Sequence, residues 1–180
     1  TALWCVPYDV EGLAELMGGN DIFEERLDDY FENVFFKPER GNRSIHGNEP
    51  SHHVAYMYNR IGRPYKTQHW VREILSRCYS TDRKGFDGNE DCGQMSAWYI
   101  LSSLGLYMLN PADGWYELGA PCVEEAKLKL HSGKTLRIVA KNLSDTTTTV
   151  QKVTFNGQQI DDWRISHAEL MQGGNLVFEY

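Results

Sequence analysis

The chain has 180 residues, a formal net charge of −7, and 41% apolar and 12% aromatic residues. This composition is typical of a globular protein that buries a core, and it excludes an intrinsically disordered chain. The negative charge disfavours nucleic acid and anionic membrane surfaces as partners, because their phosphates would repel it. Since no run of about 18 apolar residues occurs, we also expect no transmembrane helix.

The N-terminal residues, TALWCV, are apolar and aromatic and contain neither Met nor a basic segment. They do not resemble a signal peptide, and we expect the chain to begin inside a longer protein. The four cysteines show no CxxC spacing, which argues against a zinc ribbon or a redox motif. We expect buried free thiols, with two disulfide bridges as the alternative.

Helical periodicity predicts helices throughout residues 1–110. Asp9 is expected to cap the first helix and Asn20 the second, and Pro38 is expected to end the second. The predicted helices begin near residues 9, 20, 51, 67 and 93 and end near 17, 37, 61, 78 and 104. The segment 93–104 is apolar on nearly all sides, which predicts a buried helix, whereas the segment from Thr67 is amphipathic. Alternating inner and outer helices are typical of an α/α toroid.

The pattern changes after Pro111. Residues 126–131 and 135–140 alternate with a period of two, and Asn156-Gly157 is a strong hairpin signal. Residues 166–169 form a capping-box sequence for one helical turn. The sequence therefore predicts a mainly α fold with a β tail, in which residues 1–110 are helical hairpins and residues 111–180 a small antiparallel β segment.

Two acidic loops, GNEPSHH at 47–53 and GNEDCGQ at 88–94, each precede an apolar helical segment. The helices behind them are expected to begin 42 residues apart, which predicts a repeated hairpin that brings Glu49 and Asp91 to the same end of the fold. Paired carboxylates suit glycoside hydrolysis, with inversion when they lie roughly 6.5–9.5 Å apart and a covalent nucleophile at about 5 Å. The alternative is that both acids merely favour helix N-termini.

Other functional signals are weaker. Asp87, Asn89 and Asp91 alternate as calcium ligands do, but the segment is not an EF-hand. A zinc site at His46 and His52 is disfavoured, because Pro50 interrupts the helical spacing that zinc pairs need. Most aromatic residues are expected in the core. Trp4 is the exception, because it precedes the first loop and could stack on a sugar ring.

The two acidic loops, with VPYDVEGL at 6–13, GRPYKTQ at 62–68 and MSAWY at 95–99, resemble glycoside hydrolase family 92. The resemblance covers nearly the whole chain. It implies a calcium-dependent, inverting exo-α-mannosidase with an N-terminal β-sandwich and a C-terminal (α/α)6 toroid. This chain would be the last hairpins of that toroid plus the closing β segment, a C-terminal fragment of a secreted or periplasmic bacterial enzyme.

The resemblance also assigns roles to residues. The general base falls on Asp91, within the acidic triplet that also contains Asn89 and Glu90, and the family often has Asp where Asn89 stands. Asn48 and Glu49 match part of the calcium site, where the metal binds the mannose 2- and 3-hydroxyls. The family's general acid would lie in a segment just before Thr1.

Substrate contacts are expected from His46, Glu49 and Trp4. Enzymes specific for α-1,2 linkages carry a His-Glu pair at the outer subsite, and this chain has His46-Gly47. The linkage therefore stays open, with α-1,2 as the first expectation. The expected partners are mannose-containing glycans and the missing N-terminal part of the enzyme.

Three functional readings follow. In the first, the chain supplies the base and part of the calcium site but is inactive without the upstream acid. In the second, it is a non-catalytic fragment that binds carbohydrate or protein and self-associates through exposed apolar flanks. In the third, it is a complete enzyme that uses Glu49 as its own acid.

Overall fold

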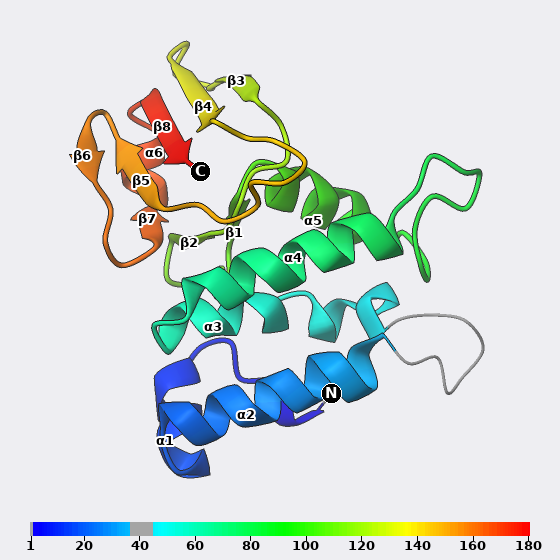
Figure 1. Ribbon diagram of the computed structural model, residues 1–180. Coiled ribbons are helices and arrows are strands. Elements are labelled where there is room, and N and C mark those ends of the chain that lie inside the picture. Colours follow the sequence, from blue (N-terminus) through cyan, green and yellow to red (C-terminus); the bar gives the residue numbers. More distant parts are fainter. Residues whose placement is uncertain (1, 37–44) are drawn as a thin grey trace.

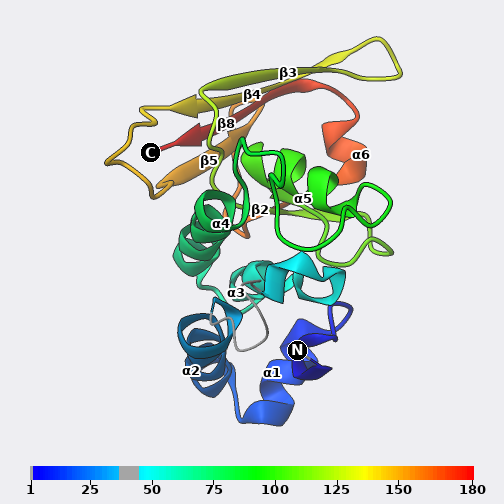
Figure 2. The same cartoon turned by 90° about the vertical axis from the view of Figure 1, so that its right-hand side faces the viewer.

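The computed structural model describes residues 2–36 and 45–180, which form a helical layer followed by two small β-sheets (Figure 1). The described residues contain six α-helices, five of them before the first strand. After a turn at Ala2–Trp4, helices α1 to α4 are stacked below the sheets, and a view turned by 90° shows the sheets as a separate layer (Figure 2). The fold is therefore mixed, and its place in a toroid remains a prediction.

Helices α1 (Val10–Met17) and α2 (Asn20–Tyr30) form the first hairpin. The side chain of Asp9 accepts a hydrogen bond from the Gly12 amide at 2.9 Å, which confirms the predicted cap. Helix α2 continues into a π-helical turn at Phe31–Phe35. The predicted stop at Pro38 lies outside the described residues.

The predicted helix over residues 51–61 is confirmed only over its last turn, Met57–Arg60, and is wrong for the residues before it. Those residues form short turns, because the Ser51 hydroxyl donates to the carbonyl oxygens of Ile45 and Asn48, at 2.9 and 2.7 Å. Such side-chain bonds compete with the helical backbone pattern. The turns and the one short helix among them are Ile45–Gly47, Glu49–Ser51, Val54–Tyr56 and α3 (Met57–Arg60).

Helix α4 (Pro64–Cys78) begins three residues earlier than predicted, because Pro64 fits the first turn of a helix. Helix α5 (Gln94–Ser103) occupies its predicted place but is not buried all round. Met95 and Trp98 face the core, whereas Tyr99 is 43% and Ile100 57% exposed. The prediction of a fully buried helix is therefore wrong for the part of the chain that the structure describes.

The first sheet pairs β1 (Leu106–Tyr107), β2 (Trp115–Leu118) and β7 (Arg164–Ser166) in that order, all antiparallel. The second has the order β3-β4-β8-β5-β6. Its strands are Glu125–Lys129, Thr135–Lys141, Gly174–Glu179, Lys152–Phe155 and Gln158–Gln159 in the same order. The hairpin at Asn156-Gly157 and the Ser166 capping box of α6 (His167–Leu170) are confirmed. The predicted antiparallel β segment is confirmed at the other pairings of the described strands and is wrong at one, because β4 and β8 are parallel.

Among the described residues, the buried apolar side chains form two cores, one in the helical layer and one in the β layer. Buried polar contacts join them. The side-chain amide of Asn59 donates to Glu117 at 3.1 Å and to the Leu118 carbonyl at 3.0 Å. The Gln68 side chain accepts a hydrogen bond from the Val150 amide at 2.8 Å. These contacts fix the β layer against α3 and α4.

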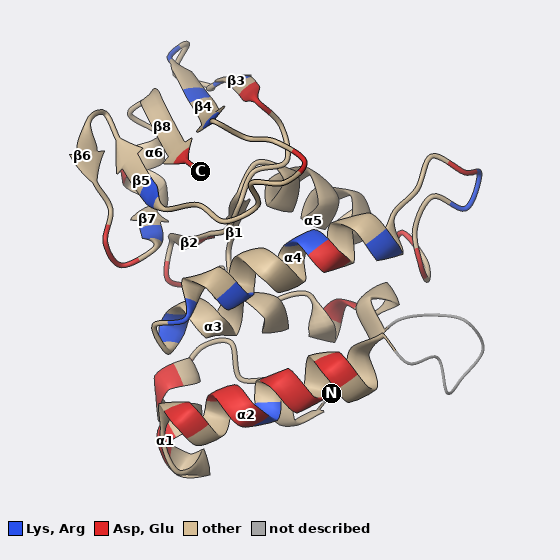
Figure 3. Cartoon of the chain, in the orientation of Figure 1, with Lys and Arg blue, Asp and Glu red and all other residues tan. Residues whose placement is uncertain are grey.

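Acidic residues lie along the exposed side of α2 (Figure 3). One of them, Glu24, is neutralised by two basic residues at the start of α4, because Arg63 and Lys66 each form an ion pair of 2.7 Å with it. No disulfide joins the four cysteines, all of which lie among the described residues, and only Cys78 is buried. Among the described residues, no helix is both long and apolar enough to span a membrane.

Candidate active site

The two acidic loops meet backbone against backbone at their glycines. A Cβ atom on Gly88 would lie 2.2 Å from the carbonyl oxygen of Gly47, and one on Gly47 would lie 3.0 Å from the Gly88 amide nitrogen. Gly88 also has φ +76°, a conformation that side chains disfavour. Glycine at both positions therefore allows the loops to touch.

Beyond this contact, the carboxyl groups of Glu49 and Asp91 come within hydrogen-bonding reach of one another. Asp91 is exposed, and Glu49 is partly buried. The neighbouring Glu49 carboxyl is the main cause that raises the pKa of Asp91 above its ordinary value. The structure thus brings together the two acids that the 42-residue spacing predicted to converge.

The Asp91 loop has an unusual backbone. Asp91 and Cys92 have φ angles of 48° and 57°, and Gly93 follows with 93°. Left-handed conformations of non-glycine residues cost energy and occur often at functional sites. Three successive left-handed residues turn the chain sharply, so that Asp91 stands at the start of α5 without being part of it.

The other residues of the triplet have different surroundings. The carboxylate of Glu90 accepts hydrogen bonds from the Ser96 amide at 3.0 Å and from the Ser96 hydroxyl at 2.9 Å. Glu90 therefore satisfies the first turn of α5 and stabilises the loop. Asn89 is exposed beside it.

Asn48 is exposed next to Glu49, and its carbonyl oxygen accepts a hydrogen bond from the Ser51 amide at 3.1 Å. Its side-chain amide and the Glu49 carboxylate offer oxygen atoms, the ligands that calcium prefers. Within residues 2–36 and 45–180, however, no three His, Cys, Asp or Glu side chains gather as a metal site. The donor type fits calcium, but the described residues do not complete a coordination shell of six to eight oxygens.

Behind the acidic pair lie three buried histidines. His46 is fully buried, with its Nε2 atom 2.8 Å from the Tyr79 hydroxyl, and burial holds its pKa far below the ordinary value. His52 stacks on His46, with ring centroids 4.6 Å apart. The Nε2 atom of His53 lies 2.6 Å from the Trp4 carbonyl oxygen. Burial lowers the pKa of His52 and His53 as well, so all three are neutral.

Two predicted sugar contacts are corrected by this geometry. His46 is 0% and Trp4 3% exposed among the described residues. The Trp4 ring packs edge-on against Phe23, with centroids 5.4 Å apart, and contacts Tyr30. Both side chains are therefore packing groups, because neither offers a sugar an open face.

A contact absent from the sequence-based predictions joins the two loops. The Gln94 side-chain nitrogen lies 3.1 Å from the Nδ1 atom of His52. Gln94 is part of the second acidic loop motif but was assigned no role. The sequence did indicate this pairing, because Gln94 follows His52 by 42 residues, as Asp91 follows Glu49.

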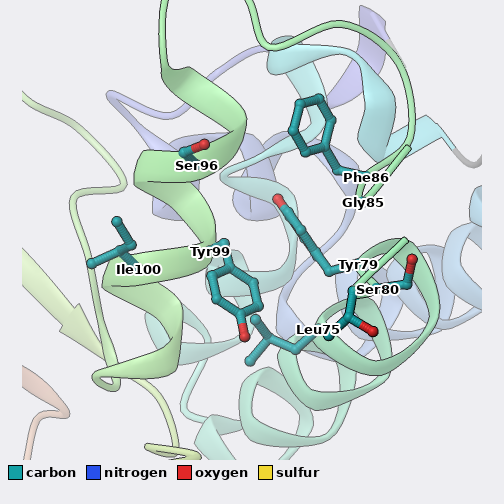
Figure 4. Close-up of a pocket in the computed structure, with 9 residues that line it drawn as sticks. Leu75, Tyr79, Ser80, Gly85, Phe86, Ser96, Tyr99 and Ile100 are labelled. Carbon is teal, nitrogen blue, oxygen red and sulfur yellow. The ribbon is translucent and has the colours of Figure 1, made fainter. Parts of the chain in front are cut away.

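A separate apolar cavity of about 510 Å³ lies between the C-terminal end of α4, the segment 79–86 and α5. Leu75, Tyr79 and Phe86 line it together with the exposed Tyr99 and Ile100 (Figure 4). It contains none of the acidic pair. Its apolar lining indicates a surface for packing rather than for chemistry.

Comparison with known proteins identifies the family. The model of the glycosyl hydrolase family 92 catalytic domain matches residues 1–180. The chain belongs to glycosyl hydrolase family 92. This finding confirms the resemblance seen in the two acidic loops.

Members of family 92 with solved structures share the fold of this chain. A family 92 α-mannosidase from Bacteroides thetaiotaomicron is 37% identical, with a TM-score of 0.89 over 98% of this chain and 23% of its own. A family 92 inverting mannosidase from the same organism is 34% identical, with a TM-score of 0.86 over 98% of this chain and 26% of its own. The first of these enzymes has also been solved in complex with mannoimidazole.

Among curated proteins, a secreted glycosidase from Arthroderma benhamiae that is described as uncharacterized is 28% identical over 174 residues. These residues are 95% of this chain and 21% of that protein. The chain thus spans about a quarter of the length of its family 92 relatives.

Proposed function

We propose that this chain is part of an α-mannosidase that hydrolyses terminal α-mannosides with inversion, and that Asp91 is its general base. The observation that carries the proposal is the contact between Glu49 and Asp91, two acids from separate loops that meet at an accessible end of the fold. Membership in family 92 and the likeness to solved mannosidases support it.

The same contact argues against Glu49 as the general acid. The acid and base of an inverting glycosidase lie roughly 6.5–9.5 Å apart, and the carboxyl pair of a retaining one about 5 Å. Glu49 and Asp91 are within hydrogen-bonding reach, which leaves no room for a sugar between them. We propose that the acid belongs to another part of the full-length enzyme, so that this chain alone has no turnover.

In the proposed reaction, Asp91 accepts a proton from a water molecule while the water oxygen attacks the anomeric carbon. The glycosidic bond breaks, and the acid outside this chain protonates the leaving oxygen. A raised pKa makes Asp91 a stronger base, and Glu49 is the group that raises it. Asn89, exposed beside Asp91, is proposed to contact the same water.

Glu90 has a structural part in this proposal. Both of its carboxylate oxygens already accept hydrogen bonds from Ser96. We therefore propose that Glu90 holds the shape of the loop and does not move a proton.

For calcium, we propose that Asn48 and Glu49 contribute oxygen ligands and that other parts of the enzyme complete the shell. When bound, the ion would hold sugar hydroxyls and favour a flattened ring. Calorimetric titration of the enzyme with Ca²⁺ tests this without an activity assay. Glu49→Gln should weaken binding at least tenfold, whereas Glu25→Gln, an exposed acid on α2, should leave it unchanged.

The function is tested by mannose release from an α-1,2-linked mannobiose, with α-1,3 and α-1,6 isomers as comparison. We expect release by the full-length enzyme and none by the 180-residue chain. Asp91→Asn should reduce kcat by about 10²–10⁴-fold. Full activity of that variant would refute the assignment of the base, and activity of the 180-residue chain would restore Glu49 as a candidate acid.

The natural substrates are proposed to be mannose-containing glycans, with α-1,2 linkages as the first to test. Because the Arthroderma relative is a secreted glycosidase, we propose a secreted or periplasmic location.

One observation favours a second candidate function, a non-catalytic binding fragment. Tyr99 and Ile100 expose apolar surface at the rim of the α4–α5 cavity. If the 180-residue chain acts alone, this surface would support self-association. Light scattering decides, because a monomer at high concentration would speak against this candidate.

A further inference from the structure

The hydrogen bond between His52 and Gln94 is the third contact between the two acidic loops. The first two are the backbone contact of Gly47 with Gly88 and the carboxyl contact of Glu49 with Asp91. In the third, the Gln94 side-chain nitrogen lies 3.1 Å from Nδ1 of His52. The three contacts follow one another along both loops in the same order.

The surroundings of His52 determine which atoms donate. Its Nε2 atom lies 2.9 Å from the carbonyl oxygen of His46, which can only accept, so Nε2 carries the hydrogen. Since burial keeps the ring neutral, Nδ1 has a lone pair and needs a donor. The amide group of Gln94 supplies it. The hydrogen bond is therefore specific in direction, and a side chain without a donor cannot replace it.

Short backbone links connect this hydrogen bond to both acids. The His52 amide donates to the Glu49 carbonyl at 3.0 Å, and the Gln94 amide donates to the Asp91 carbonyl at 3.2 Å. Glu49 and Asp91 each precede their bridging residue by three positions. The Trp98 indole nitrogen of α5 also donates to the His52 carbonyl at 2.9 Å. The bridge is thereby connected through the backbone to both acidic residues.

We propose that the His52–Gln94 hydrogen bond is a positioning contact that holds the carboxyl groups of Glu49 and Asp91 against each other. This inference rests on the proposed function for its catalytic consequence, but its geometric content stands by itself. Gln94 touches neither the reacting water nor the sugar in this scheme and acts through the placement of Asp91. Displacement of a reacting group by about 1 Å reduces rates by as much as about 10²-fold.

The test is Gln94→Met in the full-length enzyme, because methionine keeps the length and helix propensity of glutamine but has no donor. The matched control is Ser102→Ala. Ser102 also lies on α5 and accepts a buried hydrogen bond of 2.8 Å from Tyr56, so this bond joins α5 to the turn at Val54–Tyr56 and involves neither acid. Each variant is examined for thermal unfolding, kcat, KM and crystal structure.

We expect both variants to lose a similar few degrees of Tm. Gln94→Met should lower kcat by about 10–100-fold with KM within twofold, and its crystal structure should show the two carboxyl groups apart. Ser102→Ala should keep kcat within twofold.

Carboxyl groups that stay in contact in the Gln94→Met structure would overturn the proposal, whatever the activity. Unchanged kcat in Gln94→Met, together with an inactive Asp91→Asn, would also overturn it while leaving the proposed function intact. An active Asp91→Asn would instead refute the proposed function. The crystal structure of Gln94→Met would then decide the positioning question alone.

Discussion

Glu117 on β2 allows a quantitative prediction about pH and stability. Its side chain is 2% exposed, and it accepts hydrogen bonds from Asn59 at 3.1 Å and Arg60 at 3.2 Å. Burial raises the pKa of Glu117 to about 7, and the attraction of Arg60 only partly offsets this. Arg60 also pairs with the more exposed Glu11 at 2.8 Å.

The direction in which folding shifts the pKa of Glu117 determines whether the protein gains or loses stability as the pH rises. The folded protein binds this proton more tightly than the unfolded chain does, whose Glu pKa is about 4.5. The stabilisation is therefore fully present below pH 4.5 and is lost as the pH rises from 4.5 to about 7. At about 1.4 kcal/mol per pKa unit, the loss amounts to roughly 3 kcal/mol.

Glu117→Gln removes this proton and with it that part of the pH dependence. Urea unfolding at pH 4.5, 6 and 8 measures the free energy of unfolding of both proteins. The free energy of unfolding of the variant, relative to that of the wild type, should rise by about 3 kcal/mol between pH 4.5 and pH 8. A difference between the two proteins that is the same at every pH would refute the reasoning. Glu11→Gln serves as a second variant. It removes the other partner of Arg60, so Arg60 should stabilise the Glu117 carboxylate more strongly. The loss of unfolding free energy should then occur at lower pH than in the wild type.

Three further substitutions test the site and its support by thermal and urea unfolding. Cys92→Gly should stabilise the protein by about 0.5–1 kcal/mol, because it removes a left-handed strain of about 1–2 kcal/mol at the cost of a more flexible unfolded chain. Destabilisation would contradict this account. Gly88→Ala should destabilise by more than about 2 kcal/mol, because its Cβ would lie 2.2 Å from the Gly47 carbonyl oxygen, and a neutral effect would mean that the loops can separate freely. Gln68→Met should cost about 1–3 kcal/mol by leaving the buried Val150 amide unpaired, and an unchanged midpoint would show that another acceptor replaces it.

The equal spacing of the two Gly-Asn-Glu loops predicted the meeting of Glu49 and Asp91, although short turns follow the first loop and a full helix follows the second. The spacing of 42 residues needs no knowledge of the packing between the hairpins. The same spacing does not by itself indicate which side chains bridge the loops, and no sequence pattern assigns a role to His52 or Gln94. Their pairing depends on burial, which only the folded structure defines.

Two local predictions were wrong for physical reasons. The segment after Ser51 has an apolar helical pattern, but the Ser51 hydroxyl binds the carbonyls of Ile45 and Asn48 and ends the turn. The alternating strands predicted a hairpin arrangement, yet β4 and β8 are parallel neighbours. Alternation defines the buried face of a strand but not its direction.

Helix α5 shows that an apolar sequence pattern does not predict which neighbours bury a helix. Its sequence is apolar on nearly all sides, as in a helix that is covered by neighbours on every face. In the described residues only the side with Met95 and Trp98 is covered, and Ile100 stays 57% exposed. An apolar pattern predicts that a helix face is buried, but it does not identify the segment that packs against that face.

The position of β8 has a consequence for how the chain acquires its structure. Although it is the last strand in sequence, it lies at the centre of the five-stranded sheet, between β4 and β5. The hairpins β3–β4 and β5–β6 can each form early from local contacts, but β8 must be inserted between them before they belong to one sheet. Until residues 174–179 are available, both hairpins would therefore keep an unpaired edge, and unpaired strand edges favour aggregation.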